Sequence, residues 1–321
     1  MTLTPTLVVP GAVAAEEPDL GVPAHYGDPF GEARTLVAGG AFVDLSHRGV
    51  VRVSGPDRLS WLHSLSTQHL TELAPGTSTR ALVLSPHGHI EHDLHLVDDG
   101  SACWITVEPG TAPVLVEFLD KMRFMLRVEV ADLSAERAVL WLPAAHPAGP
   151  DAPTWFSPAE LGEFAGREVL VPRADLAAVV GGLGRPAGVW AHEALRIAAH
   201  DPRLGRETDH RTIPHEIGLL APAVHLNKGC YRGQETVARV HNLGRPPRRL
   251  VFLHLDGSDS ALPGHGEPVT LDGREVGFVT SSARHHDLGP IALALIKRNT
   301  PRDAELTAGD TAVSTEVVVD A

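Results

Sequence analysis

The most informative stretch of this sequence is KGCYRGQE, at residues 228–235. It contains one of the two cysteines and one of the two tyrosines in a chain of 321 residues. A thiol that lies beside cations and near the start of a regular element has a lowered pKa, because both features favour the thiolate. Glycine permits backbone conformations that expose such a thiol. The pattern therefore predicts a loop that is used in chemistry or recognition.

The two cysteines have different sequence surroundings. Cys103 lies in the apolar run ACWITV at 102–107, and a free cysteine in such a run commonly fills a core. Cys230 has small, charged and amphipathic neighbours, which are typical of a surface or a cleft. From the residues alone, a packing role and a functional role both stay open for Cys230.

Composition and charge limit the classes of function. The length is compatible with two or three domains, and a hydrophobic content of 43% is enough for real cores. A formal net charge of −13 argues against nucleic acid and acidic membranes as partners, because both require clustered positive charge. No apolar run approaches the roughly 20 residues of a membrane span, and the first basic residue is Arg34, unlike in a secretory or transit signal. We expect a cytoplasmic protein with reduced thiols, because two cysteines make no disulfide framework.

Hydrophobic periodicity predicts mixed α and β structure up to about residue 246 and β structure after it. Helices are predicted at 28–40, from Ser54, at 111–122, at 174–180 and at 189–199, and strands at 41–45, 50–53, 81–84, 90–97, 126–130 and 169–171. The buried face of the third helix is predicted to be Val114, Leu115, Phe118, Leu119 and Met122. Short strands at 250–255, 269–271, 276–280, 291–296 and 313–319 indicate a small all-β domain.

Two segments lack periodicity. Residues 1–24 are rich in Pro, Ala and Thr and predict a flexible lead-in. Residues 143–153 are rich in Pro, Ala and Gly and predict a linker or a long loop.

Four histidines, His87, His89, His92 and His95, cluster in one predicted strand. Alternation places His92 on the inner, apolar face of that strand and the other three on a polar, outer face. No second cluster has metal-ligand spacing, so we predict no metal site. A His92 side chain that faces a pocket is the more useful hypothesis.

Five arginines follow the cysteine closely in an otherwise acidic chain: Arg232, Arg239, Arg245, Arg248 and Arg249. They suit either a solvated loop, with their stems packed on the surface, or a pocket for a carboxylate-bearing ligand, since arginine binds carboxylates bidentately. We favour the pocket because the cluster adjoins the cysteine loop.

Residues 228–235, followed by Val237-Ala238-Arg239, resemble the signature of the YgfZ family. Its members are folate-binding proteins of iron–sulfur cluster assembly, related to the T-protein (aminomethyltransferase) of glycine cleavage. Further segments resemble the superfamily in the same order along the chain: 25–27, 43–49, 55–67, 88–94, 193–197, 212–216 and 276–281.

Two positions depart from the T-protein pattern. Where the T-protein has two adjacent aspartates near the reacting folate nitrogen, this sequence has His92 and Asp93. Where the T-protein has a glutamate that grips the pterin ring, this sequence has Ala198 after Leu195-Arg196-Ile197. Alanine cannot accept the paired hydrogen bonds that a carboxylate accepts. Both departures argue against aminomethyl transfer and favour the YgfZ type.

The resemblance implies an α+β, three-lobed, cloverleaf-like T-protein fold with a central channel. It implies a lead-in at residues 1–24 and two α+β lobes at residues 25–246 that meet near 138–153, and it leaves open whether these lobes interleave. Residues 247–321 form a small C-terminal β-barrel.

The resemblance also implies a tetrahydrofolate cofactor and iron–sulfur client or assembly proteins as partners. It assigns Cys230 as the acting thiol, with the catalytic candidates Lys228 and Asp93. The remaining loop residues, which shape or order the motif, are Gly229, Tyr231, Arg232, Gly233, Gln234 and Glu235. The folate-binding candidates are His92, Arg196, Glu216, Arg239 and Arg245.

Two alternatives remain from the sequence. A true aminomethyltransferase would use Asp93 as its acid or base. A folate-binding regulatory module without chemistry would bind folate independently of Cys230.

Overall fold

The computed structural model describes residues 4–319 apart from 148, 245 and 258–260. The chain divides into two compact units. The first unit comprises Met1–Val83, His92–His192 and Asn227–Tyr231, and the second comprises Leu84–Glu91, Glu193–Leu226 and Arg232–Ala321.

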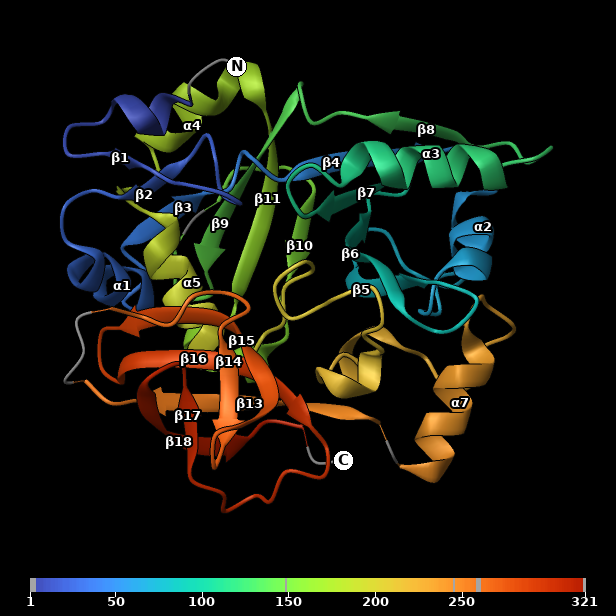
Figure 1. Cartoon of the computed structure of the whole chain (residues 1–321). Helices are drawn as coiled ribbons and strands as arrows, with labels where there is room; N and C mark the ends of the chain where they lie inside the picture. Colours follow the sequence, from blue (N-terminus) through green and yellow to red (C-terminus); the bar gives the residue numbers. More distant parts are fainter. Residues whose placement is uncertain (1–3, 148, 245, 258–260, 320–321) are drawn as a thin grey trace. The chain divides into compact units, whose positions relative to one another are not determined.

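One sheet of the first unit has the strand order β5-β6-β7-β4-β8 (Figure 1). Its strands are β4 (Gly49–Ser54), β5 (Ser78–Leu84), β6 (Ile90–Asp98), β7 (Ala102–Val107) and β8 (Glu129–Asp132). Alternate residues, among them Val51, Leu94 and Ile105, point to one face and form a core with α2 (Arg58–Leu65) and α3 (Ala112–Met122). The predicted strands and helices of this region are confirmed, with two differences: the buried face of α3 and the start of the strand that follows it.

Helix α3 buries a narrower face than the sequence predicts. Leu115 and Leu119 are fully buried, whereas Val114 and Met122 are 59% and 44% exposed. The strand predicted from residue 126 begins only at Glu129, so Leu126 also stays exposed. An apolar residue at helical spacing is therefore not always buried, because the sheet covers only part of the helix surface.

The second sheet of the first unit has the order β10-β11-β9-β3-β12. Its strands are β3 (Ala41–Asp44), β9 (Arg137–Pro143), β10 (Thr154–Phe156), β11 (Gly166–Pro172) and β12 (Arg185–Ala187). Associated helices are α1 (Pro29–Val37), η2 (Ala159–Phe164), η3 (Arg173–Asp175) and α4 (Leu176–Gly181). The strands β3 and β4 follow one another in the chain but belong to different sheets.

The N-terminal segment is packed from Thr4 onward. It contains η1 (Pro5–Val8) and a short pair of strands, β1 (Val13–Ala14) and β2 (Pro23–His25). Thr6 and Val22 are fully buried, and the Thr6 hydroxyl donates a hydrogen bond to the Asp44 carboxylate. The sequence predicts a flexible lead-in here because its composition lacks periodicity, and composition does not reveal such individual anchors.

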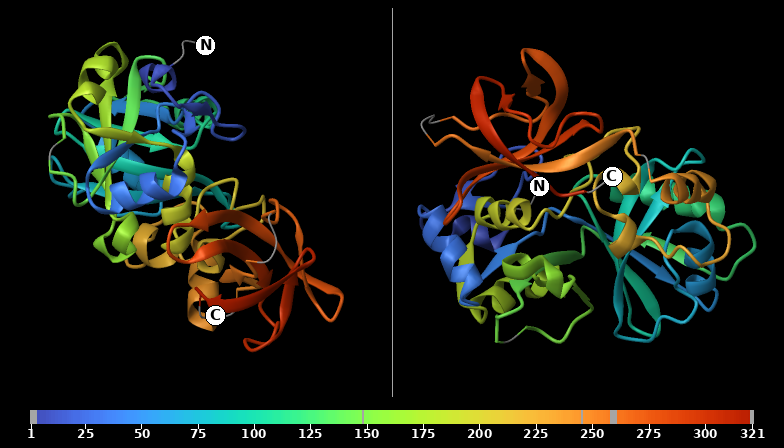
Figure 2. Two further views of the ribbon diagram at one scale, coloured as in Figure 1. Left: turned by 90° about the vertical axis from the view of Figure 1, so that its left-hand side faces the viewer. Right: turned by 90° about the horizontal axis from the view of Figure 1, so that it is seen from below.

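The second unit contains a closed barrel of six strands in the order β13-β16-β15-β14-β17-β18 (Figure 2). The strands are β13 (Arg248–Leu255), β14 (Pro268–Leu271), β15 (Arg274–His285), β16 (Gly289–Lys297), β17 (Leu306–Ala308) and β18 (Thr311–Val317). In β13, Val251 and Leu253 face the barrel core, while Leu250 and Phe252 pack with Ala194 and Ile197 of helix α5 (Val189–Ala198). The predicted C-terminal β-barrel is confirmed.

Three short helices complete the second unit: η4 (Pro214–Glu216), α6 (Leu220–Ala223) and α7 (Gln234–Leu243). No helix in the described parts of the chain has the length and apolar character that crossing a membrane requires.

A buried carboxylate, that of Glu168 on β11, joins the two sheets of the first unit. It accepts a hydrogen bond from Arg48 at 2.6 Å, lies 3.1 Å from the His95 ring of β6, and also binds the hydroxyl of Thr106 on β7. Trp155 of β10 stacks on the same His95 ring at 3.8 Å. Burial alone would raise the pKa of Glu168, but the nearby Arg48 and His95 hold it well below the usual range.

We expect Glu168→Gln to lower the free energy of unfolding by about 3 kcal/mol, because it removes the nearer of two carboxylates that pair with the buried Arg48, Glu168 at 2.6 Å and Glu108 at 3.2 Å. The matched control is Glu117→Gln, which removes an exposed pair with Lys121 and should leave the free energy of unfolding nearly unchanged. The lowered pKa means that the Glu168 contribution is present above about pH 4.5 and is lost as pH falls further. Denaturation at pH 7 and pH 3 measures both effects, and equal costs for the two variants at pH 7 would refute this role for Glu168.

Candidate functional site

The cysteine loop alternates between buried anchors and exposed residues. Lys228 and Tyr231 are only 6% and 8% exposed, whereas Gly229 and Cys230 between them are exposed. Cys103, by contrast, lies in the core of the first sheet, where burial raises the pKa of its thiol. Of the two cysteines, Cys230 is therefore the one whose sulfur solvent and ligands can reach.

Both anchors are polar side chains held in the first unit. The Lys228 ammonium donates hydrogen bonds to backbone carbonyl oxygens and lies 5.2 Å from the centre of the Tyr231 ring. Burial lowers the pKa of Lys228 to about 8 and raises the pKa of Tyr231 to about 12. At neutral pH the lysine is thus mainly charged and the phenol is neutral.

The second half of the motif belongs to the second unit. Arg232 forms a half-exposed ion pair with Glu91 at 3.0 Å. Gly233 is the N-cap of α7 and has the left-handed conformation, with φ +83°. A Cβ at this position would lie 2.6 Å from the carbonyl oxygen of Ser85 and 2.9 Å from Cα of Gly88. The turn between β5 and β6 therefore packs directly against the start of α7, and only glycine fits there.

The last two motif residues, Gln234 and Glu235, and the predicted cation Arg239 lie on α7. Gln234 and Glu235 occupy its first turn, where an acidic side chain is favoured by the helix dipole. Arg239 is exposed on the same helix. Arg245 lies outside the described residues.

The two motif glycines differ, and we expect their alanine variants to differ as well. Gly233→Ala should cost about 2 kcal/mol or more, because it combines a left-handed backbone with a contact against the Ser85 carbonyl. Gly229→Ala should cost less than about 0.5 kcal/mol, since its backbone is not left-handed and, apart from its chain neighbours, no described residue lies within 4 Å of the added Cβ. Chemical denaturation of both variants measures the difference, and equal costs would contradict this structure of the loop.

Strand β6 places His92 and Asp93 on opposite faces, and both are buried. His92 lies on the face of Leu94 and Leu96, with its ring 6.3 Å from that of Phe118. Its Nδ1 atom is buried and has no hydrogen-bond partner among the described residues. Burial lowers the pKa of His92 to about 4, so the ring is neutral at physiological pH.

Strand alternation places Asp93 on the polar, outer face, which predicts an exposed side chain. In the structure Asp93 is buried. The Arg80 guanidinium of β5 donates to both of its oxygens, at 2.9 Å and 2.5 Å. Burial alone would raise the pKa of Asp93, but Arg80 lowers it below the usual value. The reason for the difference is that Arg80 covers this face, and a carboxylate held in this way is a weak proton acceptor.

Two of the predicted folate-binding residues have charged partners inside the second unit. Arg196 is buried and binds Glu193 at 2.9 Å and Glu207 at 3.1 Å. Glu216 is fully buried and accepts two hydrogen bonds from Arg248, at 2.8 Å and 2.9 Å. Residues of the chain therefore already neutralise the charges of Arg196 and Glu216.

Sequence reasoning missed three residues that shape the site. Arg80 holds Asp93, Glu91 pairs with Arg232, and the Ser85 carbonyl restricts Gly233. Gly88, between the predicted strands 81–84 and 90–97, was a signal for the last of these, since a glycine in a tight turn often permits close approach of another segment. Nothing in the local sequence indicated the other two.

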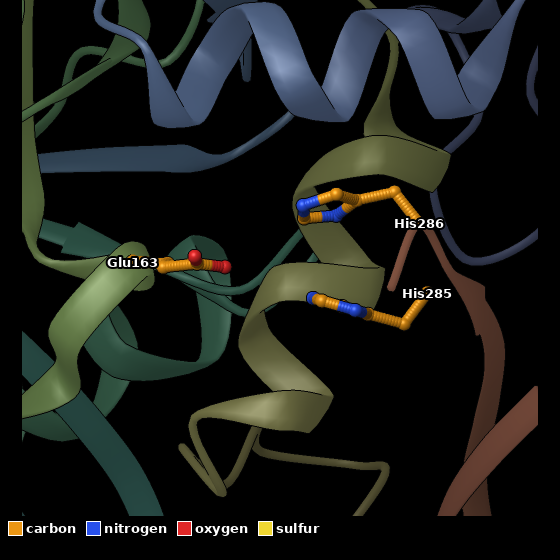
Figure 3. A group of neighbouring side chains, drawn as sticks. All are labelled: Glu163, His285 and His286. Atoms are coloured by element: carbon orange, nitrogen blue, oxygen red, sulfur yellow. The ribbon is translucent and has the colours of Figure 1, made fainter. Parts of the chain in front are cut away.

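Figure 3 shows two neighbouring histidines at the end of β15, His285 and His286. Their ring centroids lie 4.3 Å apart, and Nδ1 of His285 accepts hydrogen bonds from the amides of Asp287 and Leu288. Two imidazoles supply only half of the four ligands of a structural zinc site, so we assign no metal to this pair. Glu163, drawn in the same figure, belongs to the first unit.

Comparison with known proteins gives the same family for both ends of the chain. The profile of the GCVT N-terminal domain matches residues 5–157, and that of the glycine cleavage T-protein C-terminal barrel domain matches residues 248–320. An aminomethyltransferase of Geobacillus kaustophilus is 30% identical over 288 residues, which are 79% of this chain and 78% of that protein.

Two further proteins extend the comparison. A chloroplastic protein of Arabidopsis thaliana, provisionally named a transferase, is 30% identical over 290 residues; these cover 80% of this chain but only 65% of that protein. The crystal structure of glycine cleavage system aminomethyltransferase T from Bartonella henselae has a TM-score of 0.81 and 20% identity, and the match covers 96% of this chain and 93% of that one. At that identity the likeness concerns the fold. Together with the matching domain profiles and the 30% identical aminomethyltransferase, it shows that this chain belongs to the glycine cleavage T-protein family.

Proposed function

We propose that this protein is a tetrahydrofolate-dependent accessory factor in the assembly or repair of iron–sulfur clusters, with Cys230 as its acting thiol. The wider T-protein family is established by the comparisons. The narrower assignment rests on the resemblance of residues 228–235 to the YgfZ signature and on the exposure of Cys230.

The exposed sulfur between two buried anchors is the observation that carries the proposal. A cysteine that only fills space is buried, as Cys103 is. Cys230 instead lies between Lys228 and Tyr231, which fix the backbone on either side of it and leave the thiol accessible. A fixed, reachable thiol suits a residue that binds sulfur, iron or a one-carbon unit for a limited time.

The folate part of the proposal rests on the family and on one unused polar atom. Among the predicted folate-binding residues, His92 combines a buried side chain with a ring nitrogen that has no partner among the described residues. A buried, unpaired nitrogen is costly, and a bound ligand that supplies a hydrogen bond would remove that cost.

Tetrahydrofolate would supply a carrier for one-carbon units, since such chemistry is generally provided by the cofactor. The protein would contribute the hydrogen bond of His92 and the position of the thiol.

We expect Cys230→Ser to fold normally and to lower the activity of iron–sulfur enzymes in a strain that depends on this protein. The exposed position of the residue makes a large loss of stability unexpected. Unaltered iron–sulfur enzymes in that strain would remove the centre of the proposal.

Alkylation of the native protein provides a direct check on the thiol. Iodoacetamide should label Cys230 in the folded protein and Cys103 only after unfolding, as peptide mass spectrometry can show. Labelling of both thiols at similar rates would mean that the Cys230 thiol is no more accessible than the Cys103 thiol.

Calorimetric titration with tetrahydrofolate tests the cofactor separately. We expect binding to persist in Cys230→Ser and to weaken by about fivefold to tenfold in His92→Leu, because one hydrogen bond contributes about 1 kcal/mol. The matched control is His87→Leu, in the exposed turn between β5 and β6, which should bind as the wild type does. Equal affinity in all of these variants would exclude His92 from the folate site, and absence of heat with the wild type would exclude the folate.

Aminomethyl transfer is the second candidate, and the names of the bacterial relatives favour it. The geometry of Asp93 argues against it, because Arg80 occupies both carboxylate oxygens. Turnover of an aminomethylated carrier protein with tetrahydrofolate would establish this candidate, and no turnover with supplied carrier would eliminate it.

A further inference from the structure

The side chain of Lys228 ends among backbone carbonyl groups of the first unit. Its Nζ donates to the carbonyl oxygens of Ser66 at 2.6 Å and Gln68 at 3.0 Å, and also to that of His63. An ammonium group has three N–H donors and no acceptor. These carbonyls therefore use every donor of Lys228, and none remains for the sulfur of Cys230.

The acceptors surround the C-terminal end of helix α2. This helix ends at Leu65, with Ser66 as its C-cap. The last carbonyl groups of a helix have no partner within the helix and form the negative end of its dipole. A cation with several N–H donors can form hydrogen bonds to these carbonyl groups and balance their negative partial charge. The compact, rotatable ammonium of lysine suits three diverging acceptors, whereas the planar fork of arginine does not.

Tyr231 strengthens the same attachment. Its ring lies 5.2 Å from Nζ of Lys228, close enough for an attraction between the cation and the ring. The loop is thus fixed at Lys228 and at Tyr231, and the exposed Gly229 and Cys230 lie between these points.

We propose that Lys228 is a positioning residue, which holds the loop 227–231 on the end of α2 through backbone carbonyls and does not itself activate the thiol. The inference rests on the proposed function, because the position of the loop matters for function only if Cys230 acts. It gives Lys228 a different task from the one that its place beside the cysteine suggests, which is to stabilise the thiolate by charge.

The lysines of the chain provide an internal control in the wild-type protein. They are Lys121, Lys228 and Lys297, and both of the others are exposed. Under brief acetylation of the folded protein with an N-hydroxysuccinimide ester, we expect Lys228 to react at least about tenfold more slowly than the other two, because its amine must first leave the carbonyls. Similar rates for all three lysines would overturn the inference.

A matched pair of variants separates positioning from activation. In Lys228→Met we expect amide hydrogen exchange in residues 227–231 to become at least about tenfold faster, with no change in the barrel strands. The pH midpoint of Cys230 alkylation should stay the same. Lys121→Met, the same substitution at an exposed position, should change neither quantity.

Two outcomes would contradict the inference: unchanged exchange in the loop of Lys228→Met, or an alkylation midpoint that rises by about one pH unit, as loss of a thiolate-stabilising charge predicts. If Lys228→Met does not fold, the acetylation rates of the wild type still decide the question. All of these measurements use purified protein without a cluster-assembly assay. A failure of the iron–sulfur role would therefore leave the attachment of the loop by Lys228 standing and remove only its use in function, whereas a failure of the attachment would leave the iron–sulfur role untouched.

Discussion

The buried carboxylate of Glu168 constrains how the two sheets of the first unit are joined. A charge removed from water costs several kcal/mol unless all of its partners are in place, and here the partners come from three other segments, at Arg48, His95 and Thr106. A shift of β11 by one residue would turn Glu168 to the opposite face of its sheet and leave that charge unpaired. The interaction therefore fixes the position of β11 relative to β6 of the other sheet, the strand that carries His92 and Asp93.

Much of the architecture could be predicted from the sequence, because alternation and helical periodicity are local properties. The barrel strands and the helices α1, α2, α3 and α5 follow from these patterns, and the three-residue strand β17 was missed because it is too short to show one. The candidate site was harder to predict from the sequence than the fold. The partner of a charged residue lies far away in the sequence, so Arg196 and Glu216 resembled ligand-binding residues although Glu207 and Arg248 neutralise them.

The motif at 228–235 shows the same limit within a few residues. Its composition correctly indicated an exposed cysteine, and it predicted that the two glycines shape the loop; the structure shows a left-handed backbone at Gly233. It could not indicate that Lys228 is buried, because this depends on the end of α2, which is distant in the chain. Nor could it distinguish the two glycines, since only the turn between β5 and β6 makes Gly233 indispensable. Each residue of a compact motif can thus serve a different physical purpose.

The burial of Cys103 has a consequence for redox chemistry. A cysteine oxidised to sulfenic acid is commonly rescued by a second, resolving thiol. The only other cysteine of this chain, Cys103, is fully buried in the core, and its thiol donates a hydrogen bond to the Asp98 carboxylate. Burial raises the pKa of this thiol and so keeps it in the unreactive, protonated form. Any disulfide formed by Cys230 must therefore join it to another molecule, so the oxidation state of this protein depends on its reductants and partners and not on its own sequence.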